Sequence, residues 1–255
     1  MIRTQIGKLF YQDIPKLISA IRQLSSARKV HSRGLSFKLV SDNFITKYRA
    51  NTFNDKEPEM LDWLDENLQA GDVFFDVGAN VGIYSIYAAL RKPTANIYAF
   101  EPEYSNLHQL KQNILENSLT RNIYPYALAL DENMGISQLH VQDTTPGAAK
   151  HSVSKHDLEK TFTGEDVVWR EGIATISLDE FCNLSQIKPN LVKIDVDGTE
   201  TDILKGGQKT LCNPDLRTVY IEVDAKQAEC EEILTNYGFL LIDMPSDNQI
   251  WRRPR

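Results

Sequence analysis

Short apolar runs that alternate with helical patterns are the feature that most constrains this chain of 255 residues. The run Val73–Val77 ends at a glycine, and a helix is expected from about Val81 to Leu90. Such runs, without polar alternation, are typical of strands buried on both faces of a parallel sheet. Further strands are expected at Ile97–Phe100, Ile123–Ala127, Leu191–Val196, Val219–Val223, Phe239–Ile242 and Gln249–Arg252. With amphipathic helices between several of them, the pattern predicts a doubly wound α/β sheet.

The last two expected strands set the topology at one edge of this sheet. They are joined by Met244–Asn248, a connection too short for the crossover helix that a parallel pair needs. We therefore expect an antiparallel pair at the C-terminus of a seven-stranded, mostly parallel sheet.

Two segments fall outside this pattern. We interpret residues 1–56 as an N-terminal appendage, with a basic helix from about Phe10 to Arg28 and two short extended segments between Leu35 and Phe53. Residues 57–255 form the Rossmann-like domain. Within it, residues 142–172 are polar, rich in turn residues and long for a connection, so they are either a lid over a substrate or a disordered insertion.

The charge is unevenly distributed. The net charge is −7, yet residues 1–34 hold seven basic residues and one acidic residue, so the remainder carries −13. An acidic body excludes a nucleic acid as the main substrate, whereas the basic helix is either a solvated face or a peripheral contact with anionic lipid. No stretch has the length and apolarity of a membrane span, and three cysteines without a CxxC pair favour a cytoplasmic protein.

The turn after the first expected strand indicates a nucleotide-type pocket. Gly78 and Gly82 allow close backbone approach, and the start of the following helix can bind an electron-rich group. The GxGxxG fingerprint of dinucleotide binding is absent because Asp76 and Asn80 stand where glycines are needed. Asp76 would repel a diphosphate and attract a sulfonium cation. Glu101, at the end of the next strand, can accept hydrogen bonds from both ribose hydroxyls.

These residues resemble the class I S-adenosylmethionine-dependent methyltransferases, and further motifs resemble the FkbM family among them. The motifs are Asp76–Asn80, Glu101-Pro102, Asn113, Asn117, Asp179, Leu191–Glu200 and Ile203–Gly207. The resemblance covers about Glu57 to Tyr237. The family usually has glutamate where this chain has Asp197, so the carboxylate here has a shorter reach.

The resemblance implies an O-methyltransferase that uses S-adenosylmethionine. The residues expected to hold it are Asp76, Gly78, Ala79, Asn80 and Gly82, with Glu101 on the ribose and Ala127 near the adenine. The implied acceptor is a hydroxyl of a sugar, glycan or secondary metabolite.

Acceptor chemistry is expected at the end of the Leu191–Val196 strand. Asp195 and Asp197 alternate onto one face there, at the sheet edge where ligands bind, and are candidates for positioning the acceptor and removing its proton. The alternative for Asp197 is a helix cap. His151, in the 142–172 segment, is a second candidate base, as is His156.

Three alternatives stay open at this point. Asp195, Asp197, Glu222 and Asp224 offer oxygen ligands for a magnesium or calcium ion that would lower the pKa of an acceptor hydroxyl. A nicotinamide-dependent oxidoreductase is disfavoured by the missing glycines. A noncatalytic cofactor-binding module would use the basic helix for docking.

Overall fold

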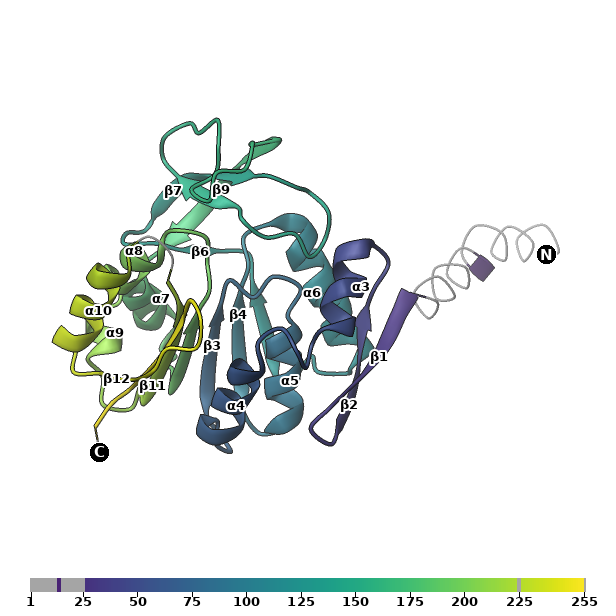
Figure 1. The fold of residues 1–255 in the computed structure, drawn as a ribbon, viewed down its shortest axis with the longest axis horizontal. Coiled ribbons are helices and arrows are strands. Elements are labelled where there is room, and N and C mark those ends of the chain that lie inside the picture. Colours follow the sequence, from purple (N-terminus) through teal and green to yellow (C-terminus); the bar gives the residue numbers. More distant parts are fainter. Residues whose placement is uncertain (1–12, 15–25, 224–225, 255) are drawn as a thin grey trace, which may run out of the picture.

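A seven-stranded sheet forms the centre of the molecule (Figure 1). The computed structural model describes residues 13–14, 26–223 and 226–254. The strands of this sheet are β3 (Val73–Val77), β4 (Asn96–Phe100), β5 (Ile123–Tyr126), β10 (Leu191–Ile194), β11 (Thr218–Glu222), β12 (Leu240–Asp243) and β13 (Asn248–Arg252). Their order is β12-β13-β11-β10-β3-β4-β5. The five strands from β11 to β5 are parallel, and β13 is antiparallel to both neighbours. The expected fold class is confirmed.

Two helical layers cover the sheet because its strands are apolar on both faces. Phe74 of β3 packs with one layer and its neighbour Phe75 with the other. The first layer contains α4 (Pro58–Asn67), α5 (Ile83–Arg91) and α6 (Tyr104–Glu116), and the second α7 (Leu178–Ser185), α8 (Glu200–Lys205), α9 (Gln208–Leu211) and α10 (Gln227–Asn236). Over the described residues, none of the helices has the length and apolarity to cross a bilayer.

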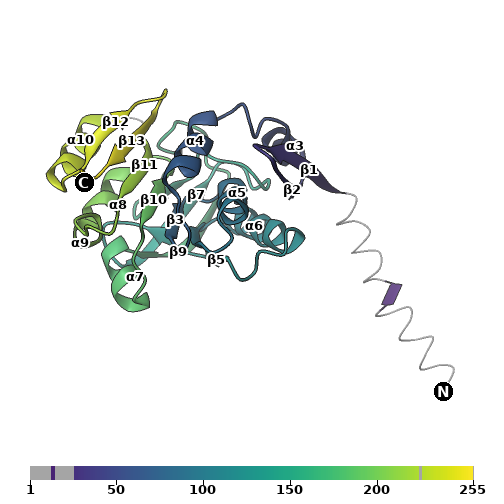
Figure 2. The same cartoon turned by 90° about the horizontal axis from the view of Figure 1, so that it is seen from below.

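A small N-terminal unit stands beside the first helical layer, at the opposite end of the molecule from β12 (Figures 1 and 2). It is a hairpin of β1 (Ala27–Ser32) and β2 (Leu35–Val40), followed by α3 (Phe44–Asn51). The second extended segment expected between Leu35 and Phe53 is thus wrong. The helix forms because Asn43 caps it, accepting from Thr46 N at 2.9 Å in a capping box. Most of the expected basic helix lies outside the described residues.

Polar side chains of α6 attach this N-terminal unit to the body. Asn113 accepts from Val40 N at 2.8 Å, and Gln109 donates to Val40 O at 2.7 Å. Asn117 accepts from Lys38 N at 2.9 Å and donates to Lys38 O at 2.7 Å. The amide side chains of α6 therefore pair with β2 as a neighbouring strand would.

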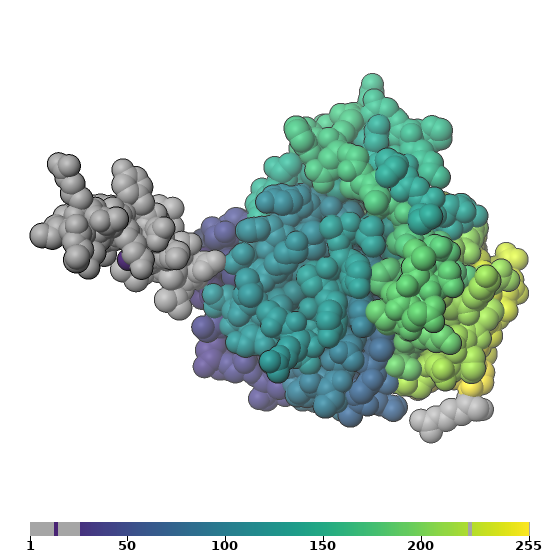
Figure 3. Space-filling view, turned by 180° about the vertical axis from the view of Figure 1, so that it is seen from behind, coloured from purple at the N-terminus to yellow at the C-terminus, as the bar shows by residue number. Residues whose placement is uncertain are grey.

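A second, four-stranded sheet rises above the body as the teal and green cap of Figure 3. It consists of β6 (Ala129–Leu130), β7 (Gly135–Val141), β8 (Ser152–Ser154) and β9 (Trp169–Ile176), in the order β6-β9-β7-β8. Residues 142–172 thus contain β8 and the first part of β9. Long-range pairing with β7 orders both strands, which the polar composition did not predict.

Candidate functional site

The turn after β3 is fixed between two other strands. Gly78 has φ +73°, and a Cβ atom there would lie 1.9 Å from the carbonyl oxygen of Asp195. Only glycine fits such a position. The backbone N–H groups of Gly78 and Ala79 both donate to Phe100 O at 3.0 Å. The turn therefore packs closely against the ends of both β4 and β10.

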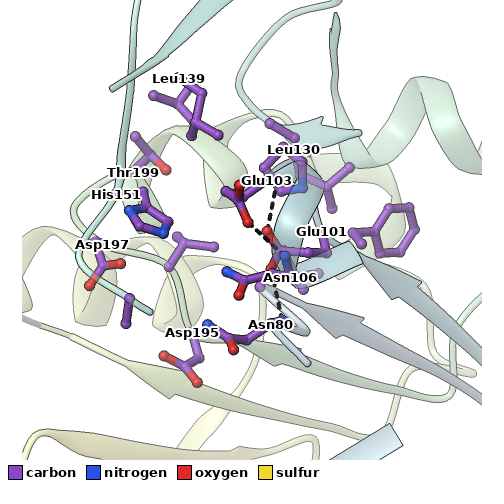
Figure 4. Close-up of a pocket in the computed structure, with 18 of the residues that line it drawn as sticks. Asn80, Glu101, Glu103, Asn106, Leu130, Leu139, His151, Asp195, Asp197 and Thr199 are labelled. Atoms are coloured by element: carbon purple, nitrogen blue, oxygen red, sulfur yellow. Dashed lines mark hydrogen bonds between the residues drawn. The ribbon is translucent and has the colours of Figure 1, made fainter. Parts of the chain in front are cut away.

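Asn80 and Glu101 form the next part of the site (Figure 4). Asn80 adopts φ +51°, and its N–H donates to Glu101 Oε2 at 2.7 Å, while Glu103 N donates to Glu101 Oε1 at 2.8 Å. Burial raises the pKa of Glu101 to about 8. The two hydrogen bonds lower the pKa, but their effect is smaller than that of burial. Glu101 is thus held in one orientation at the end of β4, the position expected of a ribose-binding carboxylate.

A buried ion network lies beneath the turn. Lys193 Nζ is 3.1 Å from Asp76 Oδ1 and 3.1 Å from Asp195 Oδ2, and it also donates to Gly78 O at 3.2 Å. Ser85 Oγ donates to Asp76 Oδ2 at 2.5 Å. Burial lowers the pKa of Lys193, but the two carboxylates outweigh it and the net shift is upward. Asp76 is 1% exposed, so it supports the turn from below.

Asp195 and Glu222 form a carboxyl pair at the ends of β10 and β11. The hydrogen bond and negative charge of Asp195, with burial, raise the pKa of Glu222 to about 9. Burial opposes ionisation of Asp195, yet Lys193 and the hydrogen bond from Glu222 bring its pKa below the usual range. At neutral pH the pair therefore holds one proton, on Glu222, and Asp195 is the ionised member.

The chain after β7 covers this site. Ala148 O accepts from Asn80 Nδ2 at 2.7 Å and from Asn106 Nδ2 at 3.1 Å. Farther along, Lys150 N donates to Asp197 Oδ2 at 2.6 Å. Asp197 thus binds the covering segment. The N-cap residue of α8 is Thr199, which makes no side-chain capping hydrogen bond.

His151 points into the space enclosed by this segment (Figure 4). Gln142 N lies 3.5 Å from its Nδ1, at the outer limit of a hydrogen bond, and this contact favours the tautomer with the proton on Nε2. Nε2 is buried and has no hydrogen-bond partner among the described residues. Burial lowers the pKa of His151, so the ring is neutral at pH 7 and Nε2–H is a donor for a ligand.

The cavity enclosed in this way has a volume of about 280 Å³. The residues named by the sequence that line it are Gly78, Asn80, Glu101, His151, Asp195, Asp197 and Glu222. Asp76, Ala79, Gly82 and Ala127 do not line it. Gly82 instead permits helix packing, because a Cβ atom there would lie 2.1 Å from Leu110 Cδ1. A neighbouring cavity of about 520 Å³ contains His156 and shares Val153 and Thr199 with the first.

The residues considered for a metal ion do not form a metal-binding cluster in the described chain. Within residues 26–223 and 226–254, no group of three or more His, Cys, Asp or Glu side chains is arranged to hold an ion. Asp224 lies outside the described residues.

Three cationic residues that sequence reasoning missed also line the cavity, and one of them, Lys150, belongs to the covering segment. Arg49, from α3, and Lys56, from the loop before α4, belong to the N-terminal segment. No motif marks them. Their place at the site depends on the docking of β2 onto α6. The hydrogen bonds that dock β2 join residues more than 60 positions apart in the chain.

Comparison with known proteins assigns the family. The FkbM methyltransferase domain matches residues 76–241. The hexuronic acid methyltransferase AglP of Haloferax volcanii is 27% identical over 180 residues, covering 70% of this chain and 68% of its own. The 31-O-demethyl-FK506 methyltransferase FkbM of Streptomyces tacrolimicus is 27% identical over 198 residues, covering 69% of this chain and 75% of its own. A crystal structure of FkbM from Methylobacillus flagellatus shares 16% identity, with a TM-score of 0.46 over 83% of this chain and 55% of that one. The chain belongs to the FkbM family of methyltransferases.

Proposed function

We propose that this methyltransferase transfers a methyl group from S-adenosylmethionine to a hydroxyl of a sugar, glycan or similar polyhydroxylated metabolite. The observation that carries the proposal is the cavity beside the turn, which the expected donor-binding residues and the candidate acceptor-binding residues line together. Gly78, Asn80 and Glu101 provide one wall, and Asp195 and His151 provide groups for an acceptor. Donor and acceptor would therefore meet in one cavity.

The residues of the turn fit the donor. Glu101 is fixed by two backbone N–H groups and keeps lone pairs for the ribose hydroxyls. Asp195, ionised at neutral pH, supplies negative charge near the turn for a sulfonium or an ammonium group. When bound, the donor supplies an electrophilic methyl group.

The chain's own residues would position and deprotonate the acceptor. Asp195, the ionised member of the pair, would accept a hydrogen bond from the attacking hydroxyl and, because its pKa is low, would take the proton only as the new bond to that oxygen forms. His151 Nε2–H donates to a second oxygen of the acceptor and fixes its orientation. The segment that bonds to Asn80 and Asp197 covers one side of the cavity and would shield the bound molecules there from water.

Calorimetry and a transfer assay test the proposal. We expect the purified protein to bind S-adenosylhomocysteine and not NAD, and to methylate a member of a panel of glycosides, uronic acid glycosides and polyketide alcohols. Replacement of Asp195 by Asn should lower kcat by about 100-fold or more, because it removes the proton acceptor. Absence of S-adenosylhomocysteine binding would refute the proposed donor. Donor binding without transfer to any panel member would refute the acceptor class.

A further inference from the structure

The N-terminal unit brings a positive charge to the wall of an acidic cavity. Five carboxyl groups line the cavity, those of Glu101, Glu103, Asp195, Asp197 and Glu222. The cationic residues on its wall are Arg49, Lys56 and Lys150. A ligand that carries a carboxylate into this space needs one of these cations as a partner, because the other charges would repel it.

Two of the three cations have carboxylate partners of their own. Lys150 Nζ is 2.6 Å from Glu165 Oε1, and Lys56 Nζ pairs with Glu57 Oε1. Arg49 differs, because it forms no ion pair with a carboxylate anywhere in the described chain. Its one recorded hydrogen bond runs from Nε to Gly147 O at 2.8 Å. The terminal guanidinium nitrogens keep their donors for a ligand.

The position of Arg49 is fixed from both sides. Asn113, Asn117 and Gln109 attach the N-terminal unit to α6, and Asn43 Nδ2 donates to Pro146 O at 3.0 Å beside α3. The residue after Gly147 accepts a hydrogen bond from Asn80. Arg49 is thus linked through two adjacent residues of the covering segment to the turn that would hold the donor.

We infer that Arg49 binds a carboxylate inside the cavity. This inference rests on the proposed function, which supplies two sources of that group. The amino-acid end of S-adenosylmethionine carries one, and a uronic acid acceptor would carry another. A guanidinium binds either as a charge-assisted pair of hydrogen bonds. The active site is then incomplete without the N-terminal unit, which lies outside the matched FkbM domain.

A binding experiment on the full chain separates the two sources. In the first arm, calorimetry compares S-adenosylhomocysteine with its decarboxylated analogue, 5′-deoxy-5′-(3-aminopropylthio)adenosine. If the donor supplies the carboxylate, Arg49→Gln weakens S-adenosylhomocysteine about 10- to 100-fold and leaves the analogue unchanged. In the second arm, protein loaded with S-adenosylhomocysteine is titrated with methyl glucuronide and methyl glucoside. If the acceptor supplies it, Arg49→Gln abolishes a preference for the glucuronide.

Matched variants keep the result interpretable. Lys47→Gln makes the same charge change at an exposed residue of the same helix and should alter neither arm. Arg49→Lys should restore part of the lost affinity, because it keeps the charge. The inference is overturned if Arg49→Gln changes neither the affinity for S-adenosylhomocysteine nor the preference for the glucuronide. It is also overturned if the variant weakens the binding of S-adenosylhomocysteine and of its analogue equally. Failure of the wild-type protein to bind S-adenosylhomocysteine would instead refute the proposed function.

Discussion

At the scale of single residues, Lys193 holds the acidic groups of the site together. It is 1% exposed, and it lies 3.1 Å from carboxylate oxygens of both Asp76 and Asp195. Replacement by methionine keeps much of the volume but leaves the buried carboxylate of Asp76 and the half-buried one of Asp195 without their cation. We expect the free energy of unfolding to fall by about 3–5 kcal/mol, measured by urea denaturation at pH 7. Lys205→Met removes an exposed pair with Glu229 and should cause no comparable loss. Equal losses in both variants would contradict this account.

Glu101 provides a prediction about pH. Its pKa of about 8 means that the carboxyl is protonated in most molecules at pH 6 and loses its proton as the pH rises. Only the ionised form keeps a free lone pair on each oxygen for the two ribose hydroxyls, beside the backbone N–H groups of Asn80 and Glu103. Affinity for S-adenosylhomocysteine should therefore rise from about pH 6 to about pH 8, by up to tenfold per unit, and then level off. Calorimetry at a series of pH values measures this affinity. Glu101→Gln should bind more weakly and lose most of this dependence; a wild-type affinity independent of pH would contradict the assignment.

The same scale explains which site residues the sequence could predict. Glu101 and Asp195 follow apolar strands directly, so their place at the sheet edge is readable from the pattern. Asp76 sits in the same motif but faces the core, and the sequence offers no sign of this, because its partner Lys193 lies 117 positions away. Asp179, another motif residue, accepts from Lys209 N at 2.8 Å and Thr210 N at 2.7 Å, which is a structural role at α9.

At the scale of elements, the expected strands of the central sheet were predicted well and the N-terminal unit poorly. Buried parallel strands give a local signal, a short apolar run between turns. The helix α3 gives little local signal in the sequence, since only two of its eight residues, Thr46 and Ala50, are buried. The strands β8 and β9 are polar and form through long-range pairing with β7, so local composition is a poor guide to them.

The junction between β2 and α6 carries a prediction at this scale. Asn113→Ala leaves the buried Val40 N–H without its acceptor and Val81 O without its donor. We expect a loss of about 1–3 kcal/mol in the free energy of unfolding. Affinity for S-adenosylhomocysteine should also fall if Arg49 binds its carboxylate, because α3 follows β2. Asn122→Ala, at an exposed loop beyond α6, is the control for removal of an asparagine amide. Unchanged stability in Asn113→Ala would show that the junction does not depend on this side chain.

At the scale of the whole molecule, three separate parts of the chain enclose one cavity. The N-terminal unit contributes Arg49, the central sheet contributes Glu101 and Asp195, and the covering segment contributes His151. None of these parts encloses the cavity alone. A ligand that contacts all three should couple them, because it binds only the assembled form.

Hydrogen exchange measures this coupling directly. Saturating S-adenosylhomocysteine, at about 100 times its Kd, should stabilise the folded protein by about 2.7 kcal/mol and raise its Tm. Exchange should slow at residues 43–56 and 143–151 as well as at the turn of residues 78–82, because closing the cavity suppresses local opening in all three. If Arg49 binds the donor carboxylate, protection at residues 43–56 should decrease in Arg49→Gln while that at residues 78–82 persists, since the turn binds the nucleoside through other groups. Protection confined to residues 78–101 in the wild-type protein would mean that the donor binds to the central sheet alone and that the N-terminal unit is not part of its site.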